Sequence, residues 1–243
     1  MSALRLRRRA SGLGLSPRRR RRTAALPIVQ DGLVAEWRFN EGAGQVLTDY
    51  TGNGHDGQLG STSGVDTNDP AWSAEGLVFT AAQSDIVVCD TVGISGGAAR
   101  TVLAAVKTDA STNLGVEWAG SGPNFTRYTL RNSGGNLRLE VAGAGYTSSL
   151  GLSAESWHFV GVTQSGSNLN TAVLYRDGGS EAVPTSQVID TQGNFQFGKY
   201  SSLFAGMTGA YCLAYNRALS AEEVEQNRQV LTTILAARGI TLP

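Results

Sequence analysis

One stretch of the sequence, residues 32–57, limits the fold more than any other. It opens with Leu33, Ala35 and Trp37, and this spacing of two residues is typical of a β-strand with one face in a core. Glycine, asparagine and aspartate then recur through residues 40–57, at a density of turn-forming residues that a helix would not tolerate. The stretch therefore predicts a short strand that leads into connected tight turns.

Short strands and turns continue along most of the chain. A continuous apolar run at 101–107 predicts a strand that is covered on both faces. Two alternating segments, 126–131 and 137–142, flank the sequence NSGGN at 132–136, which is a hairpin signal. Such a succession predicts an all-β protein, built as a two-sheet antiparallel sandwich.

The C-terminal segment predicts a helix at about residues 220–238. Ser220 is a good N-cap, and Glu223 lies three residues later, where a capping box requires it. Val224 and Leu231 fall on one apolar stripe, and Gly239 follows as a stop signal.

Three motifs, in their order along the chain, resemble the laminin G-like, concanavalin A-like jelly-roll family of the lectin and glucanase superfamily. The first is the opening strand followed by EGAG at 41–44 and DYTGNG at 49–54. The second is a hairpin at 156–178, and the third is the closing sequence YNRALSAEE at 215–223. The resemblance implies a jelly-roll sandwich for residues 28–243, and it specifies the fold far better than the function.

The N-terminal segment, residues 1–27, has a very different composition. Nine of the chain's 20 basic residues are arginines in this segment, and the first acidic residue is Asp31. The rest of the chain therefore holds 11 basic and 20 acidic residues, a formal net charge of about −9. A run this basic cannot bury enough apolar surface to fold alone, so we predict a disordered-type arm.

We predict that this arm anchors the protein to a negatively charged partner. Guanidinium groups suit bidentate contacts with carboxylates and phosphates, so the partner would be an acidic protein surface, such as a capsid lattice, or nucleic acid. A tail that adds only solubility is the alternative. The predicted anchoring residues are Arg5, Arg7, Arg8, Arg9, Arg18, Arg19, Arg20, Arg21 and Arg22.

The two cysteines, Cys89 and Cys212, lie far apart in strand-like sequence. Nothing in the sequence marks an oxidising compartment, which favours two free buried thiols, and a disulfide stays open as the alternative.

A search for catalytic carboxylates finds none. The glucanase relatives carry E-x-D-x-x-E or E-x-D-x-E, which sets two acids on one side of a strand around the glycosidic bond. The nearest sequence here runs from Glu36 to Glu41, but Arg38 occupies the place of the middle acid. We therefore expect no catalytic residues and a protein that is not an enzyme.

Calcium is the one cofactor that the resemblance suggests. Jelly-roll relatives often hold a structural calcium ion beside the D-x-x-G-N-G loop, which makes Asp49 and Asn53 candidate ligands. Relatives also carry an acid just before the closing motif, where this chain reads Gly209-Ala210-Tyr211. The alternative is that these loop residues hold turns through side-chain hydrogen bonds.

Three classes of function compete. A lectin-like sandwich usually acts outside cells, yet this chain shows no export signal and carries a polycationic arm. We therefore predict a non-enzymatic structural or adhesive virion protein, such as a bacteriophage capsid decoration or fibre-type component. It would be assembled in the host cytoplasm as a homo-oligomer or assembly component, and would contact host glycans. The alternatives are a carbohydrate-binding domain of a bacterial cell-surface protein and a glycoside hydrolase of the glucanase branch. No window approaches the ~20 apolar residues of a membrane span.

Overall fold

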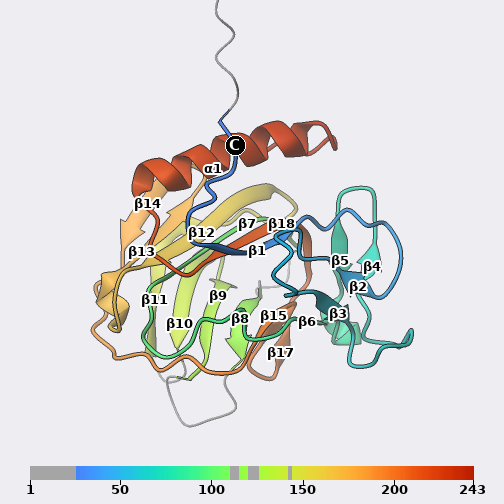
Figure 1. Ribbon diagram of the computed structural model, residues 1–243, viewed down its shortest axis with the longest axis horizontal. Helices are drawn as coiled ribbons and strands as arrows, with labels where there is room; N and C mark the ends of the chain where they lie inside the picture. Colours follow the sequence, from blue (N-terminus) through green and yellow to red (C-terminus); the bar gives the residue numbers. More distant parts are fainter. Residues whose placement is uncertain (1–25, 110–114, 120–125, 142–143) are drawn as a thin grey trace, which may run out of the picture.

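The computed structural model describes residues 26–109, 115–119, 126–141 and 144–243. In these residues two antiparallel β-sheets lie face to face, and an α-helix lies across the outer side of one of them (Figure 1). The predicted fold class, a two-sheet antiparallel jelly-roll sandwich with one C-terminal helix, is confirmed. The predicted arm, residues 1–27, lies outside the described residues except for its last two.

Sheet A forms around two long apolar strands, β7 and β18, in which all side chains are buried except the half-buried Lys107. The predicted apolar strand at 101–107 is therefore confirmed as part of β7. From one edge to the other the order is β14 (Gly179–Ala182), β13 (Ala172–Arg176), β12 (Trp157–Gln164), β7 (Arg100–Thr108), β18 (Met207–Tyr215), β5 (Leu77–Phe79) and β4 (Ala71–Trp72), and β1 (Leu33–Trp37) also pairs with β18.

Sheet B is the opposite layer. Its order is β11 (Ala144–Gly151), β10 (Asn136–Val141), β9 (Tyr128–Ser133), β8 (Val116–Ala119), β15 (Asn194–Phe197), β6 (Val87–Val88), β3 (Gly57–Leu59) and β2 (Val46–Leu47). A small hairpin, β16 (Lys199–Tyr200) with β17 (Leu203–Phe204), follows β15, and two 3₁₀ turns, η1 (Ala81–Gln83) and η2 (Leu169–Thr171), complete the described elements outside the α-helix.

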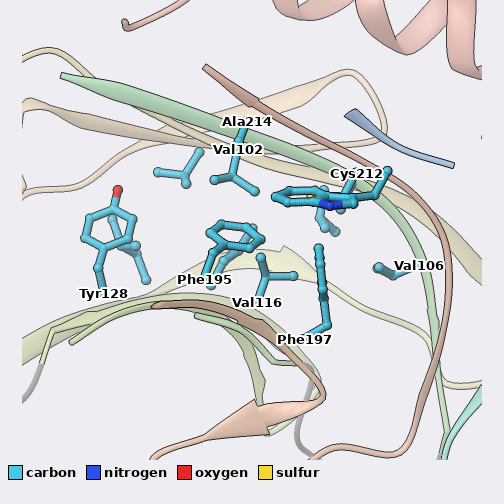
Figure 2. Packing of buried hydrophobic residues seen from close by; sticks show 14 of the residues in the cluster. Val102, Val106, Val116, Tyr128, Phe195, Phe197, Cys212 and Ala214 are labelled. Carbon is cyan, nitrogen blue, oxygen red and sulfur yellow. The ribbon is translucent and has the colours of Figure 1, made fainter. Parts of the chain in front are cut away.

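The space between the sheets is filled by apolar side chains from both layers (Figure 2). Trp37 of β1 is fully buried there and stacks on Phe195, with 5.0 Å between the ring centroids, while Phe197 meets it edge-on at 5.2 Å. The Trp37 indole donates a hydrogen bond to the carbonyl oxygen of His55, 2.9 Å away. The opening strand therefore joins the core to the turns that follow it.

A second apolar layer lies between sheet A and the helix α1 (Ala221–Ala236). The capping box predicted at Ser220 and Glu223 is present, because the Ser220 side chain accepts from the Glu223 amide and the Glu223 side chain accepts from the Ser220 amide. Asn227 of α1 accepts from the amide of Val29 and donates to the hydroxyl of Tyr215, both at 2.9 Å. The start of the described chain is thereby held against the helix.

Both cysteines are buried free thiols, as the sequence favoured. In the described part of the chain, no helix has the length and apolar character needed to span a membrane.

Candidate functional site

Two arginines lie directly opposite each other on sheet B because a two-residue turn fixes the register of its hairpin. Gly134 and Gly135 form the turn with positive φ angles of 62° and 83°, a conformation that glycine adopts without strain. The register pairs Ser133 with Asn136, and two residues further on it pairs Arg131 with Arg138. Because residues 130 and 139 face the core, both arginines point to the outer face of the sheet.

Glu140 lies beside this arginine pair and is largely buried, at 7% exposure. One of its oxygens accepts from Arg131 Nη2 at 2.8 Å and from Arg138 Nε at 2.7 Å, and the other accepts from Arg127 Nη2 at 3.3 Å. Burial opposes ionisation of this carboxyl group, but hydrogen bonds from Tyr200, Arg138 and Arg131 outweigh it and lower its pKa to about 2. Glu140 is therefore a carboxylate under all ordinary conditions.

Tyr200 reaches the same place from the β16–β17 hairpin. Its hydroxyl donates to Glu140, and its ring lies under the guanidinium of Arg131, 4.2 Å from Cζ to the ring centroid. The guanidinium of Arg127 is 5.1 Å from the same centroid. We call these five residues, Arg127, Arg131, Arg138, Glu140 and Tyr200, the arginine cluster.

Gly145 of β11 leaves space for one of these guanidinium groups. A Cβ atom at this position would lie 2.8 Å from Nη2 of Arg138 and 2.8 Å from the carbonyl oxygen of Leu139. Arg138 uses Nε for Glu140 and Nη1 for the Thr147 hydroxyl, and no group in the described residues accepts a hydrogen bond from Nη2. The absence of a side chain at 145 therefore leaves space for the Arg138 guanidinium beside β11.

The outer face of sheet B is uncovered by the described α-helix, because α1 packs on sheet A (Figure 1). The side chains of Arg127, Arg131 and Arg138 keep 16%, 14% and 23% of their surface accessible. The cluster holds three guanidinium groups and one carboxylate, and the pairing of Glu117 with Thr129 places a second acidic residue beside it on β8. Such a face can bind planar or negatively charged polar groups through bidentate hydrogen bonds.

A second candidate place is a cleft of about 500 Å³ at one end of sheet A, which we call the end cleft. Lys107 projects into it and pairs with Glu75 at 2.5 Å, beside the ring of Trp157. The hydrogen bond from Lys107 lowers the pKa of Glu75, so Glu75 is unsuited to act as a general acid. The lining residues are Ser73, Ala74, Glu75, Val78, Phe79, Thr80, Lys107, Thr108, Asp109, Glu155, Met207 and Thr208.

Asp49 and Asn53, the predicted calcium ligands, both tie their loop to β1. Oδ1 of Asp49 accepts from the amides of Glu36 and Thr51, each at 3.0 Å, and Oδ2 accepts from the amide of His55 at 3.2 Å. Asn53 donates to the carbonyl oxygen of Val34 at 2.9 Å. Burial of the Asp49 carboxyl group is outweighed by these amide donors, which lower its pKa.

These contacts are those of the alternative, in which the loop residues hold turns, because the Asp49 oxygens accept from N–H and O–H groups of the loop and of β1. In the residues that the structure describes, no group of three or more His, Cys, Asp or Glu side chains is placed to hold a metal ion. Calcium at Asp49 and Asn53 stays an untested prediction.

Other acidic residues noted in the sequence have local roles. Glu36 is buried and receives hydrogen bonds from Arg38 and Tyr211, and Glu41 accepts from the amide of Thr48 at 2.8 Å.

His158 has a carboxylate partner that lies 19 residues further along the chain. The partner is Asp177, 2.6 Å from the His158 ring, and both side chains are 6% exposed. The predicted anchoring arginines, Arg5 to Arg22, lie outside the described residues.

No protein-family model and no curated protein sequence matches this chain. Several solved structures do. The sialidase of Trypanosoma rangeli matches with 16% identity and a TM-score of 0.55, over 86% of this chain and 34% of the sialidase. Domain 4 of AbnA, a GH43 extracellular arabinanase from Geobacillus stearothermophilus, was solved with arabinotriose and matches with 16% identity and a TM-score of 0.57, over 79% of this chain and 96% of that domain. The binding domain of Paraclostridial Mosquitocidal Protein 1 matches with 14% identity and a TM-score of 0.57, over 84% of this chain and 52% of that one.

The chain shares its fold with parts of glycoside hydrolases. It spans about a third of the length of the sialidases it matches, and identities this low establish the fold alone. The likeness is compatible with a concanavalin A-like sandwich, while membership of the laminin G-like family stays a prediction.

These similar structures correct one prediction and leave another without support. The expectation that the chain is not an enzyme is contradicted, because the sialidase and the arabinanase are enzymes that contain this fold. None of the three proteins named above is a virion protein, so the predicted virion role gains nothing from them.

Proposed function

We propose that the domain binds carbohydrate on the outer face of sheet B, at the arginine cluster. The single observation that carries this proposal is that three guanidinium groups and an aromatic hydroxyl converge on one buried carboxylate, on the sheet face that α1 does not cover. Ligand sites are formed by a few polar groups held in a rigid arrangement, and sheet strands supply that rigidity. The shared fold with the arabinanase domain solved with arabinotriose supports a sugar as the ligand.

The arginine cluster suits this role better than the end cleft. In the end cleft the charges of Lys107 and Glu75 cancel in a contact of 2.5 Å, so the ion pair must be broken before either group can bind a ligand. Arg138, by contrast, already has an amino group without an acceptor in the described residues.

The arm keeps its predicted anchoring role in this proposal. The described chain begins at Leu26 beside α1, on the side of sheet A that faces away from sheet B. The arm joins the domain on this side, and the proposed sugar site is on the opposite sheet. This arrangement suits a protein that is attached to a partner by one face and binds sugar with the other. Both a virion and a bacterial cell surface fit this arrangement, and the carbohydrate-related similar structures favour the bacterial surface protein.

Titration of the full-length protein with neutral and acidic oligosaccharides tests the binding site. Arg138→Gln removes one guanidinium from the cluster, and Arg228→Gln removes one from α1 on the far side as a matched control. We expect Arg138→Gln to weaken glycan binding at least about tenfold, since a hydrogen bond to a charged group contributes about 1.5–3 kcal/mol, while Arg228→Gln changes nothing. Binding that survives Arg138→Gln but is lost on Lys107→Gln would move the site to the end cleft.

Attachment is tested separately by removing residues 1–25, which leaves the contacts of Val29 with α1 in place. We expect the shortened protein to keep its thermal unfolding transition and its sugar binding, and to lose salt-dependent retention on an acidic polymer. Equal retention of both proteins would reject the anchoring role.

A further inference from the structure

We infer that the protein has a second binding site, for a small neutral sugar, in a cleft between β1, β18 and α1 that we call the helix cleft. The cleft has a volume of about 390 Å³, within the range of roughly 300–1,000 Å³ that is common for small-molecule sites. It lies on the α1 side of sheet A, so it is separate from the arginine cluster and does not depend on the proposed function. Its main lining residues are Glu36, Arg38, Tyr211, Val230, Ile234 and Arg238.

Glu36 points into the helix cleft because of its place on β1. Ala35 and Trp37 face the core between the sheets, so the residue between them faces the other side of the strand, toward α1 (Figure 1). Glu36 is only 7% exposed, and its Oε1 accepts from Arg38 Nε at 2.9 Å and from the Tyr211 hydroxyl. Within the described part of the chain, no donor reaches its Oε2.

The carboxylate of Glu36 is therefore ready to accept a hydrogen bond from a ligand. Buried polar atoms in proteins are nearly always hydrogen-bonded, and a bond to a charged group is among the stronger ones. Burial and the neighbouring Glu36 raise the pKa of Tyr211 well above that of an exposed tyrosine, so its hydroxyl stays protonated and continues to donate to Oε1. The ligand must then donate to Oε2.

The charged groups of the helix cleft favour a neutral donor. Arg38, whose side chain is 41% exposed, and Arg238 both line it together with Glu36. Glu41, outside the lining, acts electrostatically on Arg238 and adds a second negative charge nearby. Charges of both signs face the cleft, so a charged ligand of either sign meets a like charge there. A neutral hydroxyl group satisfies Oε2 without this cost.

The opposite wall of the cleft is apolar. Ile28 is 8% exposed, Val230 is partly buried, and Ile234 keeps 38% of its surface accessible. A sugar ring carries hydroxyl groups at its edge and C–H groups on its faces, so it can contact this wall while it donates to Glu36. A ring also loses less conformational freedom on binding than an open-chain polyol does. These contacts favour a sugar as the ligand.

The helix cleft is held rigid by Arg238, which follows α1. Its Nη1 donates to the carbonyl oxygens of Arg38 at 2.9 Å and of Ala210 at 2.8 Å. Its Nη2 donates to the carbonyl oxygens of Phe39 at 3.1 Å and of Glu75 at 2.5 Å. The end of α1 is thereby tied to β18 and to the chain just after β1, and a site fixed in this way pays little to bind.

Amide chemical shifts of the full-length protein, measured by NMR during titration with D-galactose, test the inference. We expect the shifts to cluster at Glu36, Tyr211 and residues 230–234. Galactosamine and galacturonate carry a positive and a negative charge on the same ring, and galactitol is the open-chain form. We expect each of these three to bind the helix cleft at least about fivefold more weakly than galactose, as judged from the same amides.

Variants of both walls locate the site. Glu36→Gln replaces an acceptor by a neutral amide and should weaken galactose binding at least about tenfold. Ile234→Ala removes part of the apolar wall, leaves the contacts of Glu36 intact and should weaken binding several-fold. Thr233→Ala is the matched control, because Thr233 is the neighbour of Ile234 on α1 and does not line the cleft. Circular dichroism confirms that each variant is folded.

The outcomes distinguish this site from the arginine cluster. If galactose shifts amides of β9, β10 and β11 instead, and Arg138→Gln removes those shifts, the inference is wrong and the proposed function stands. If the helix cleft responds as expected while oligosaccharide binding does not depend on Arg138, the inference stands and the proposed function is wrong. No response at the helix cleft, or equally tight binding of galactitol or of either charged sugar there, would overturn the inference.

Discussion

Arg131 and Arg138 face each other across β9 and β10 on the side of sheet B that points away from the core. Two like charges in this position destabilise a sheet unless a counter-charge is near. Glu140 is this counter-charge, because one of its oxygens lies within 2.8 Å of a nitrogen of each guanidinium group. A buried carboxylate therefore holds the two arginines in place.

The first prediction concerns acid stability. The folded pKa of Glu140, about 2, lies below its ordinary value of 4.5, so its contribution to stability is complete above about pH 4.5 and is lost as the pH falls toward 2. A shift of this size corresponds to on the order of 3 kcal/mol. We expect Glu140→Gln to lower the free energy of unfolding in urea at pH 7 by about that amount, with the difference from the wild type shrinking toward pH 2. A difference that stays constant over this range would reject the assignment.

The second prediction uses two glycines of the same strand. Gly145→Ala places a methyl group 2.8 Å from Nη2 of Arg138, whereas at Gly151 the nearest atom to an added Cβ is 3.7 Å away. We expect Gly145→Ala to displace Arg138 and to reduce glycan affinity several-fold, and Gly151→Ala to bind as the wild type does. Equal affinities for the two variants would show that the position of Arg138 does not matter.

The hairpin of β9 and β10 shows which parts of the arginine cluster could be predicted from the sequence. The segments 126–131 and 137–142 and the turn between them were predicted, and a two-residue turn at Gly134-Gly135 determines that 131 faces 138 and that 129 faces 140. The pairing of the two arginines, and the position of Glu140 beside them, could therefore have been predicted by counting residues outward from the turn. No sequence motif marks them. Tyr200 was not accessible, because it arrives from a hairpin 60 residues further along the chain.

The contacts of Asp49 and Asn53, in the loop after β1, could not be predicted from the sequence motif. Family resemblance suggested calcium at Asp49, but the structure gives its carboxylate backbone donors from Glu36, Thr51 and His55. Asn53 likewise donates to Val34. These partners are set by how the loop folds back on β1, which the motif alone did not specify.

The third prediction separates these two interpretations of Asp49. Asp49→Ala leaves the amide groups of Glu36 and His55 without acceptors, and the loss at the buried Glu36 amide costs about 1–3 kcal/mol. We expect the variant to unfold at a lower temperature, and expect neither protein to respond to millimolar calcium or to a chelator. A calcium-dependent rise in Tm that is present in the wild type and absent from the variant would restore the metal site.

The fourth prediction concerns the thiols. Burial raises the pKa of Cys89 and of Cys212 well above that of an exposed thiol, and both side chains are almost inaccessible. We expect Ellman's reagent to detect no thiol in the native protein at pH 8 and to detect both after unfolding in guanidinium chloride without reductant. Failure to detect them after unfolding would indicate the disulfide that the sequence left open.

The location of the sugar site is the central claim, and amide chemical shifts measured by NMR on the full-length protein with and without trigalacturonate test it most directly. The account predicts that the perturbed amides cluster in β9, β10, β11 and at Tyr200, and that Arg138→Gln removes these perturbations. Shifts confined to Glu75, Lys107 and their neighbours in the end cleft would contradict it.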